Sequence, residues 1–312
     1  MSTFETDFCM ACFLKYAENM CIDLHTHSKY SDGSLTPKEL VHLAIRRGIR
    51  VLSLTDHDTV EGQAEIMLHG AEVGVHIIAG LEVTACHEQK SIHILGYGFN
   101  YRSTDLQDWL VRIQAGREKR NTKILHSLQN IGIDITMEEV DAFSAQGMAG
   151  RPHIAQVLVH KGVVSSVESA FHHYLGKGKV AWHKRFSYSA IETIAMIHKM
   201  GGIAVLAHPG QLDAQGTTLP GLIRQLKLRG LDGLEVYYPS HSKKLKKKLL
   251  RLCRELDLVI TGGSDYHGDT RPYRMMAGQN HTFCPAYALY SSIEEKIVQS
   301  QKGSHVYHTC CR

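Results

Sequence analysis

The sequence predicts an α/β fold in which a parallel sheet or barrel is interrupted by a mainly helical insertion. Short apolar runs alternate with amphipathic helical stretches from residue 21 to residue 101, and the alternation resumes at residue 189. Between these two regions the periodicity is mainly helical. Parallel strands need long, usually helical connections, so repeated strand-then-helix units favour a parallel arrangement. A chain of 312 residues is long enough for two domains, or for one large barrel with an insertion.

The first half of the predicted fold opens with a strand over 21–25. A helix start follows at Thr36, Pro37 and Glu39. Threonine is a good N-cap, proline suits the first helical position, and glutamate completes a capping box. The helix ends at Gly48. The other elements of this half are a strand over 50–54, a helix over 60–73, and strands over 76–84 and 91–96.

The second half contains three more strands, each preceded by a helix. The predicted elements are a helix over 189–199, a strand over 203–206, a helix over 219–228, a strand over 233–236, a helix over 243–256 and a strand over 258–261. The simplest division of the chain is a first barrel part over 20–103, a helical insertion over 104–190, a second barrel part over 191–290, and tails over 1–19 and 291–312.

Composition excludes several classes of protein. A hydrophobic fraction of 43% with 27 Gly and 7 Pro rules out a disordered, collagen-like or coiled-coil chain. No apolar run approaches the ~18 residues of a membrane span, and the run over 8–14 follows acidic rather than basic residues, unlike a secretory signal. The net charge of +4 predicts modest affinity for a phosphate backbone and no stable DNA partner.

The eight cysteines are clustered near the ends of the chain and isolated within its body. Their spacing indicates no disulfide framework of the kind found in small secreted domains. Cys9 and Cys12 match a C-x-x-C motif, but they precede any predicted strand and lack a second pair at zinc-site spacing. We therefore interpret them as part of an N-terminal tail and predict a reduced, cytoplasmic compartment.

Histidine is unusually frequent, at 21 of 312 residues. His25 and His27 end the first predicted strand and, being two residues apart, face the same side of it. Polar side chains also stand at or just beyond the other strand ends, where parallel α/β folds place their functional sites. They are Asp32, Asp56, His57, Asp58, Glu82, His93, His208, Glu235, Asp265 and His267.

This combination of imidazoles and carboxylates predicts a metal site. Such ligands without thiolates suit manganese, iron or zinc better than calcium, magnesium or a structural zinc. The set is larger than one ion needs, which favours two or three divalent ions sharing bridging carboxylates. Metal clusters of this kind lower the pKa of bound water and hold the attacking and leaving oxygens in phosphoester hydrolysis.

The motif series around these residues resembles that of the PHP (polymerase and histidinol phosphatase) family, in order and spacing over residues 20–270. The motifs are His25-Thr-His27-Ser-Lys-Tyr-Ser-Asp32-Gly, Thr-Asp56-His57-Asp, Gly80-Leu-Glu82, Ile92-His93-Ile-Leu-Gly, Ala207-His208-Pro and Ser264-Asp265-Tyr-His267. The resemblance implies a distorted (β/α)7 barrel with three metal ions, manganese first among them. It assigns His25, His27, Glu82 and Asp265 to one ion, Glu82, His93 and His208 to a second, and Asp32, His57 and His267 to a third.

Within that family, the helical insertion and Gly150-Arg151-Pro152-His153 resemble the branch that contains ribonuclease AM and the 3′,5′-nucleoside bisphosphate phosphatases. The resemblance implies removal of phosphate from bisphosphorylated nucleosides, or of 5′-terminal nucleotides from short RNA. A histidinol-phosphate type of phosphatase, a proofreading exonuclease module and a non-catalytic nucleic-acid-binding module are the alternatives. The basic insertion argues against the first, because it suits a more anionic substrate. The lack of a polymerase domain argues against the second, and the full ligand set argues against the third.

Several residues are candidates for contact with this substrate. Arg151 carries the family motif, and Arg117 and Arg120 lie in the same insertion, which we interpret as a substrate cap. A guanidinium group can hold a second phosphate through two hydrogen bonds. Asp32 and His241 complete the substrate candidates. For the reaction, a metal-bridging hydroxide is the expected nucleophile, Asp265 would orient it, and His208 or His241 would assist the leaving oxygen.

Overall fold

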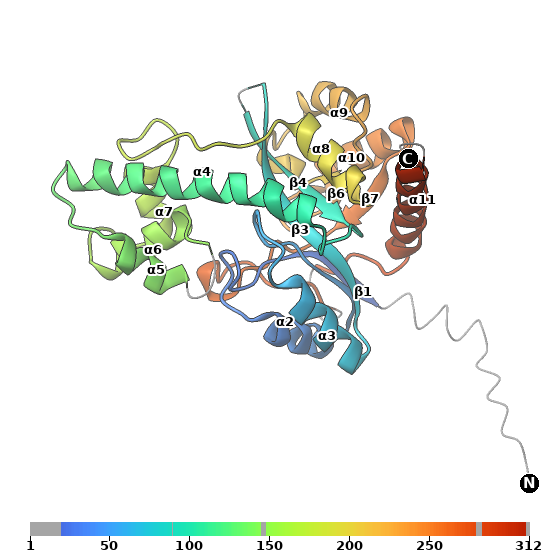
Figure 1. Ribbon diagram of the computed structural model, residues 1–312, viewed down its shortest axis with the longest axis horizontal. Helices are drawn as coiled ribbons and strands as arrows, with labels where there is room; N and C mark the ends of the chain where they lie inside the picture. Colours follow the sequence, from blue (N-terminus) through green and yellow to red (C-terminus); the bar gives the residue numbers. More distant parts are fainter. Residues whose placement is uncertain (1–19, 89, 145–147, 279–282, 310–312) are drawn as a thin grey trace, which may run out of the picture.

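The computed structural model describes residues 20–88, 90–144, 148–278 and 283–309 (Figure 1). Seven strands form one sheet in the order of the sequence. They are β1 (Cys21–Thr26), β2 (Ile49–Leu54), β3 (His76–His87), β4 (Lys90–Tyr97), β5 (Ile203–Leu206), β6 (Gly233–Tyr237) and β7 (Val259–Gly262). The segment after β7 returns to β1, where the backbone N of Asp265 donates to the carbonyl of His25 at 2.8 Å and that of His27 to Tyr266 at 2.9 Å. The predicted α/β class is confirmed.

One strand does not fit the predicted parallel arrangement. β4 is antiparallel to both β3 and β5, whereas the other neighbouring strands are parallel. The cause is local: His87 pairs directly with Lys90, so only two residues connect β3 to β4. A connection this short permits a hairpin but not a crossover.

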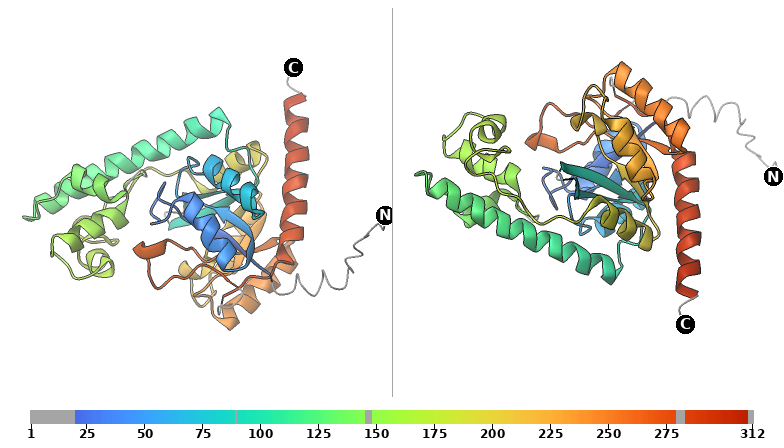
Figure 2. Two further views of the ribbon diagram at one scale, coloured as in Figure 1. Left: turned by 90° about the horizontal axis from the view of Figure 1, so that it is seen from below. Right: turned by 90° about the horizontal axis from the view of Figure 1, so that it is seen from above.

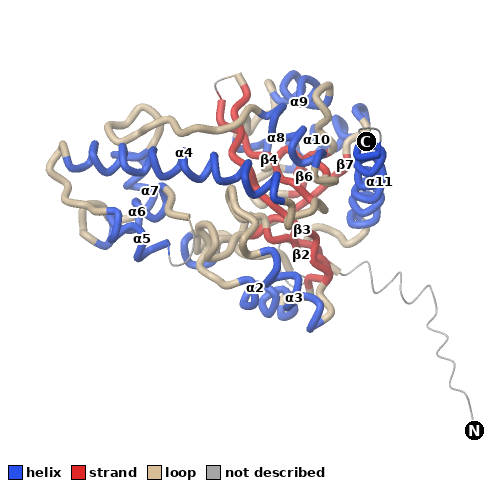
Figure 3. Tube along the Cα trace, viewed as in Figure 1, coloured by secondary structure: helices blue, strands red, loops and turns tan. Residues whose placement is uncertain are grey.

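Helices surround the strands (Figure 3). They are α2 (Pro37–Arg46), α3 (Gln63–Val73), α8 (Ala190–Lys199), α9 (Leu219–Lys227), α10 (Lys243–Leu256) and α11 (Leu289–Thr309). The capping box predicted for the first helix is present, because the Thr36 side chain accepts from the backbone N of Glu39 and the Glu39 carboxylate accepts from that of Thr36. None of the helices among the described residues combines the length and the apolarity needed to cross a membrane.

The region between β4 and α8 is helical and extends to one side of the sheet (Figures 1 and 2). It contains α4 (Thr104–Gln129), α5 (Met137–Ser144), α6 (Arg151–His160), α7 (Val167–Ala170) and a π-helical turn over Phe171–Leu175. These elements share a core of their own, which includes Ile124, Leu128, Ile154 and Leu158. The insertion therefore has its own apolar core and adds no strand to the sheet.

α11 lies on the side opposite the insertion (Figure 2) and occupies residues that the sequence assigned to a tail. Its Ile293 and Ile297 are buried in the same cluster as Ile22 and Leu24 of β1. Gln301 donates to the carbonyl of Gly98, just beyond β4. α11 thus closes the end of the strands that is remote from His25 and His27, so the polar residues are reached from the other end.

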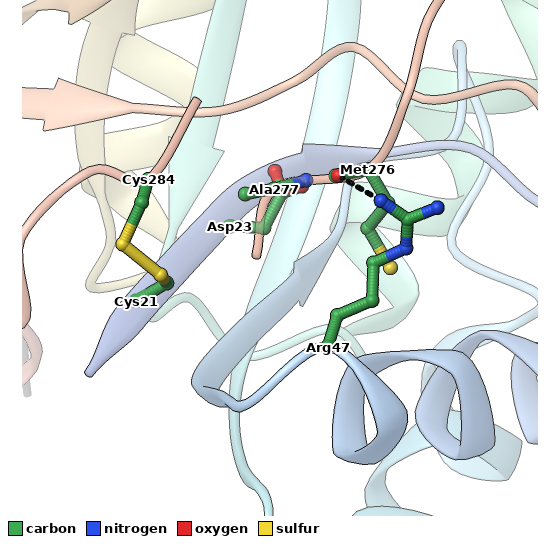
Figure 4. Close-up of a disulfide and its surroundings, with 6 residues drawn as sticks. All are labelled: Cys21, Asp23, Arg47, Met276, Ala277 and Cys284. Carbon is green, nitrogen blue, oxygen red and sulfur yellow. Dashed lines mark hydrogen bonds between the residues drawn. A yellow bond between two sulfur atoms is a disulfide. The ribbon is translucent and has the colours of Figure 1, made fainter. Parts of the chain in front are cut away.

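A disulfide joins Cys21 in β1 to Cys284, with 5.1 Å between their Cα atoms (Figure 4). The sequence indicated no such bond, because spacing does not reveal a pair separated by 263 residues. Hydrogen bonds from Ala277 to the Asp23 carboxylate and from Arg47 to the carbonyl of Met276 hold the same segment against β1 and the C-terminal end of the helix Pro37–Arg46. Disulfides persist mainly in oxidising compartments, and the predicted cytoplasmic compartment stays a prediction. Cys9 and Cys12 lie outside the described residues.

Replacing Cys284 with serine should lower the free energy of unfolding by about 2–4 kcal/mol, because the bond restricts the unfolded chain. Cys284 is exposed, so the substitution leaves the core intact. Urea denaturation measures the loss. Cys86→Ser is the matched control, since Cys86 is a free cysteine. Equal stabilities of wild type and Cys284→Ser under non-reducing conditions would contradict the bond.

Candidate metal centre

All nine residues assigned to metal by the resemblance meet at one end of the strands. His25 and Glu82 lie in β1 and β3 and are fully buried, and His93 lies in β4 and is partly exposed. The other six follow strands or lie in the loop after β1, and they are His27, Asp32, His57, His208, Asp265 and His267. Three groupings within this set have ligand atoms close enough to share an ion.

Glu82 is the centre of the cluster. One of its oxygens, Oε2, lies 3.3 Å from Nε2 of His25, 3.3 Å from Nε2 of His27 and 3.0 Å from Nδ1 of His57. The other, Oε1, lies 2.8 Å from Nδ1 of His93 and 3.0 Å from Nε2 of His208. A single buried carboxylate therefore faces five imidazoles, which is the arrangement expected of a group that bridges two ions.

Two further carboxylates complete the cluster. Asp265 Oδ1 lies 3.5 Å from His25 Nε2 and 3.3 Å from His27 Nε2. Asp32 Oδ1 lies 3.2 Å from His267 Nε2, and its Oδ2 lies 3.9 Å from His57 Nε2. Asp32 and Asp265 thus face opposite ring nitrogens of His27, with Asp32 Oδ1 3.8 Å from Nδ1 and Asp265 Oδ1 3.3 Å from Nε2.

Many ligand atoms in this cluster are buried without a hydrogen-bond partner among the described residues. They are Nε2 of His25, both ring nitrogens of His27, Nδ1 of His57, Oε2 of Glu82, Nδ1 of His208 and Nε2 of His267. Each such group costs about 1–3 kcal/mol when it is left unsatisfied. Divalent cations would satisfy these atoms, since imidazole and carboxylate are ligands that manganese, iron and zinc accept. The residues present therefore fit a metal cluster.

The electrostatics of the cluster keep its carboxylates ionised. Burial alone would raise the pKa of Asp32, but His267 and His57 hold it well below its usual value. Burial would lower the pKa of His27, but Asp265 and Glu82 raise it to about 9. The metal-free cluster therefore holds a proton on His27 at neutral pH.

Residues beside the ligands hold them in place. Glu235, buried in β6, lies 2.9 Å from Nδ1 of His25 through one oxygen and accepts from the backbone N of His208 at 2.7 Å through the other. Asp265 Oδ2 accepts from the Tyr238 hydroxyl at 2.8 Å and lies 3.3 Å from Arg271 Nη1. The sequence placed Glu235 at a strand end but gave it no role. It gave no indication of Arg271, which follows the last motif.

Four arginines gather beside the cluster. Arg117 and Arg120 are buried, and Arg151 and Arg185 are partly buried. Arg117 and Arg185 share one oxygen of Asp58, the neighbour of His57, with Arg185 Nη1 at 2.8 Å. Burial and the positive charge of Arg117 lower the pKa of both Arg120 and Arg151, and neither pairs with a described carboxylate. Arg185 was not among the substrate candidates predicted from the sequence.

The predicted proton-donating role of His241 disagrees with its contacts. Its Nδ1 donates to the carbonyl of Val236 at 2.9 Å, and its Nε2 accepts from the backbone N of Gly210 at 3.0 Å. Burial lowers its pKa, so the ring is neutral with both nitrogens engaged. His241 joins the ends of two strands and has no free nitrogen for a substrate.

A seven-stranded α/β fold that buries a carboxylate and histidine cluster beyond its strand ends defines a class of metal-dependent hydrolases. The family model for the PHP domain matches residues 23–206, and the chain belongs to this family. It is 39% identical over 245 residues to a 5′-3′ exoribonuclease of Haemophilus influenzae, covering 78% of this chain and 89% of that protein.

Two further comparisons agree. The chain is 34% identical over 250 residues to a 3′,5′-nucleoside bisphosphate phosphatase of Chromobacterium violaceum, covering 79% of this chain and 87% of that one. A solved structure from Bifidobacterium adolescentis, assigned as a metal-dependent phosphoesterase, superposes with a TM-score of 0.79 at 28% identity. That superposition covers 89% of this chain and 96% of the other.

Glu235→Gln should weaken the binding of divalent manganese about 10–100-fold, because residues that orient metal ligands contribute on this scale. The amide keeps the size of the side chain but loses the charge that holds His25. Calorimetric titration with the ion measures the affinity. Glu255→Gln on the exposed face of α10 is the matched control, since the ion pairs of Glu255 among the described residues are with Arg224 and Arg251. Equal affinities of the two variants would exclude a role for Glu235.

Metal affinity should also rise with pH. In the metal-free protein His27 is protonated below its pKa of about 9, and a ligating imidazole must release that proton. Affinity should therefore increase between about pH 6.5 and about pH 8.5, by about tenfold per pH unit for each proton released. Calorimetry in buffers of different ionisation enthalpy counts the protons. Binding without proton release at neutral pH would contradict the protonated state of His27.

Proposed function

We propose that this protein is a metal-dependent phosphoesterase that hydrolyses phosphate from 3′,5′-bisphosphorylated nucleosides and removes 5′-terminal nucleotides from short RNA. The two named relatives carry these activities, and the geometry here supports the same substrates. The observation that carries the proposal is the position of the four arginines directly beside the metal centre. A substrate with two phosphates can place one phosphate against the arginines and the other at the metal centre.

Two or three divalent ions would occupy the centre, with manganese as the proposed ion and iron or zinc as alternatives. We propose the three ligand sets given by the resemblance, with Glu82 shared between two ions. When bound, the ions supply Lewis acidity and make water a stronger nucleophile at neutral pH. The nine ligands would hold them, and α11 closes the far end of the strands.

The arginines would hold the phosphate that does not react. Asp58 fixes Arg117 and Arg185 through a shared carboxylate oxygen. Arg120 and Arg151, whose pKa values are lowered by burial and by Arg117, form an excess of buried positive charge that an anion would neutralise. A phosphate bound there leaves the nucleoside to span the distance to the metal centre, which positions the second phosphate for attack.

Two ligand residues are also placed to act on the reacting groups. His208, whose Nε2 lies 3.0 Å from Glu82 Oε1, is the residue that we propose assists the leaving oxygen. Asp265 directs Oδ1 toward His25 and His27 and anchors Oδ2 on Tyr238. We propose that Asp265 orients the attacking water and that Asp32 borders the substrate. His241 has no part in this proposal.

The alternative activities make different demands. A small amine phosphate of the histidinol-phosphate type carries one phosphate and leaves the arginines without a ligand. A binding module without turnover has no need for nine converging ligands. We therefore propose nucleotides and short RNA as the partners of this site.

With added manganese, the wild type should release phosphate from adenosine 3′,5′-bisphosphate much faster than from adenosine 3′-monophosphate, and should shorten a 5′-phosphorylated RNA pentamer. Arg151→Ala should lower kcat/KM for the bisphosphate about 10–100-fold, the loss expected for a charged hydrogen bond, and should scarcely change the monophosphate reaction.

Two controls accompany this assay. Lys177→Ala removes an exposed charge from the same insertion and should behave as wild type. Asp265→Ala should abolish all release and so exclude a contaminating phosphatase. If Arg151→Ala slows both substrates equally, the arginines do not hold a second phosphate. Histidinol phosphate as the preferred substrate would replace the proposal with the alternative.

A further inference from the structure

A cavity of about 550 Å³ lies between α5, α6 and α7 of the insertion and the loops that follow β1 and β7. In Figure 1 these loops and the insertion helices face each other across the open end of the strands. Ligand pockets in proteins fall between about 300 and 1,000 Å³, so the cavity is of the size that holds a nucleoside. None of the steps proposed above uses it.

The cavity is bordered by the two loops that carry Asp32 and His267. Ser34, which lines it, lies two residues beyond Asp32, and Thr270 lies three residues beyond His267. The Thr270 hydroxyl donates to the carbonyl of Asp32 at 2.9 Å, and the backbone N of Ser34 donates to that of His267 at 3.0 Å. The two loops that carry these ligands therefore also form one wall of the cavity, which places the cavity next to the candidate metal centre.

The opposite wall combines flat apolar and amide groups. The Phe143 ring is 39% exposed and meets His160 edge to face, with 5.7 Å between the ring centroids. Val159 and Val167 add apolar surface, and the Gln156 amide makes no hydrogen bond to another described residue. Aromatic rings stack on nucleobases, and amides pair with base edges. This wall offers both.

α6 connects the cavity to the arginines. Arg151 is its first residue, and Gln156 stands about one and a half turns further along the same helix. His153 lies between them and uses Nδ1 to accept from the backbone N of Gly150 at 3.1 Å. In a neutral ring the proton is then on Nε2, which makes that atom a donor. The same helix thus carries Arg151, the proposed phosphate contact, then the hydrogen-bond donor His153, and then Gln156 on the cavity wall.

We infer that the cavity is a nucleobase subsite, in which a base of the substrate stacks on Phe143 and pairs with Gln156. The inference rests on the proposed function for the identity of the ligand, and it adds a contact to the base that the phosphate sites do not supply. Catalysis by the metal centre does not depend on it.

The test compares substrates with and without a base. Wild type and Phe143→Ala/Gln156→Ala would be assayed on adenosine 3′,5′-bisphosphate, on 5′-phosphorylated diadenylate, and on the abasic counterpart of each. The variant should raise KM about 5–100-fold for at least one base-containing substrate and leave its abasic counterpart unchanged. Val180→Ala, which truncates an exposed apolar side chain of the insertion outside the cavity, is the control and should match wild type.

A change confined to diadenylate supports the subsite and assigns it to the second nucleotide, and a change with the bisphosphate assigns it to the first. Equal effects on base-containing and abasic substrates, or no effect, overturn the inference. If the wild type hydrolyses none of them, the phosphoesterase proposal fails on its own. Equilibrium binding of adenosine 5′-monophosphate against ribose 5-phosphate then decides: base-dependent affinity lost in the variant supports the subsite, and equal affinities overturn it.

Discussion

Glu82 is the group on which the rest of the site depends, because it is a charged carboxylate with no exposure to solvent. A buried carboxylate without partners would cost several kcal/mol and would take up a proton instead. Here burial acts to raise the pKa of Glu82, but His57, His93 and His25 hold it well below its usual range. Each of those rings stands on a different strand or loop, so the strands must converge for the charge to be tolerated. Divalent ions would then take the place of protons on His25 and His27, whose pKa values are raised by the surrounding carboxylates.

Asp58 joins this centre to the insertion. Its backbone lies in the left-handed region, at a φ of 58°, immediately after His57. Its carboxylate holds Arg117 from α4 and Arg185 from the segment that leads back to the barrel. The same short loop therefore contributes a metal ligand in one direction and anchors two cations in the other. This link explains how the arginines of a helical region with its own apolar core are held next to a site formed by the strands.

Much of the fold could be predicted because its signals are local. Strands and helices with clear periodicity, and the capping box at Thr36, appear where the sequence indicates them. The ligands could be found because they recur at strand ends and match a family's motifs. Contacts between distant segments could not. The disulfide from Cys21 to Cys284, the burial of Ile293 and Ile297 and the hold of Glu235 on His25 join residues whose spacing carries no signal of contact. The antiparallel direction of β4 was also missed, because β3 and β4 extend beyond the predicted ranges 76–84 and 91–96 and leave only two residues between them.

The position of α11 has a consequence for how the protein is made. β1 is the first strand of the fold, but its neighbours on one side are the segment after β7 and the disulfide partner Cys284, and its core contacts include Ile293 and Ile297. During synthesis, the contacts of β1 with Cys284, Ile293 and Ile297 cannot form until more than two hundred and fifty further residues have left the ribosome. Such distant contacts slow folding and leave nascent strands open to wrong partners. The insertion draws its apolar core from its own residues, so it can fold during that interval.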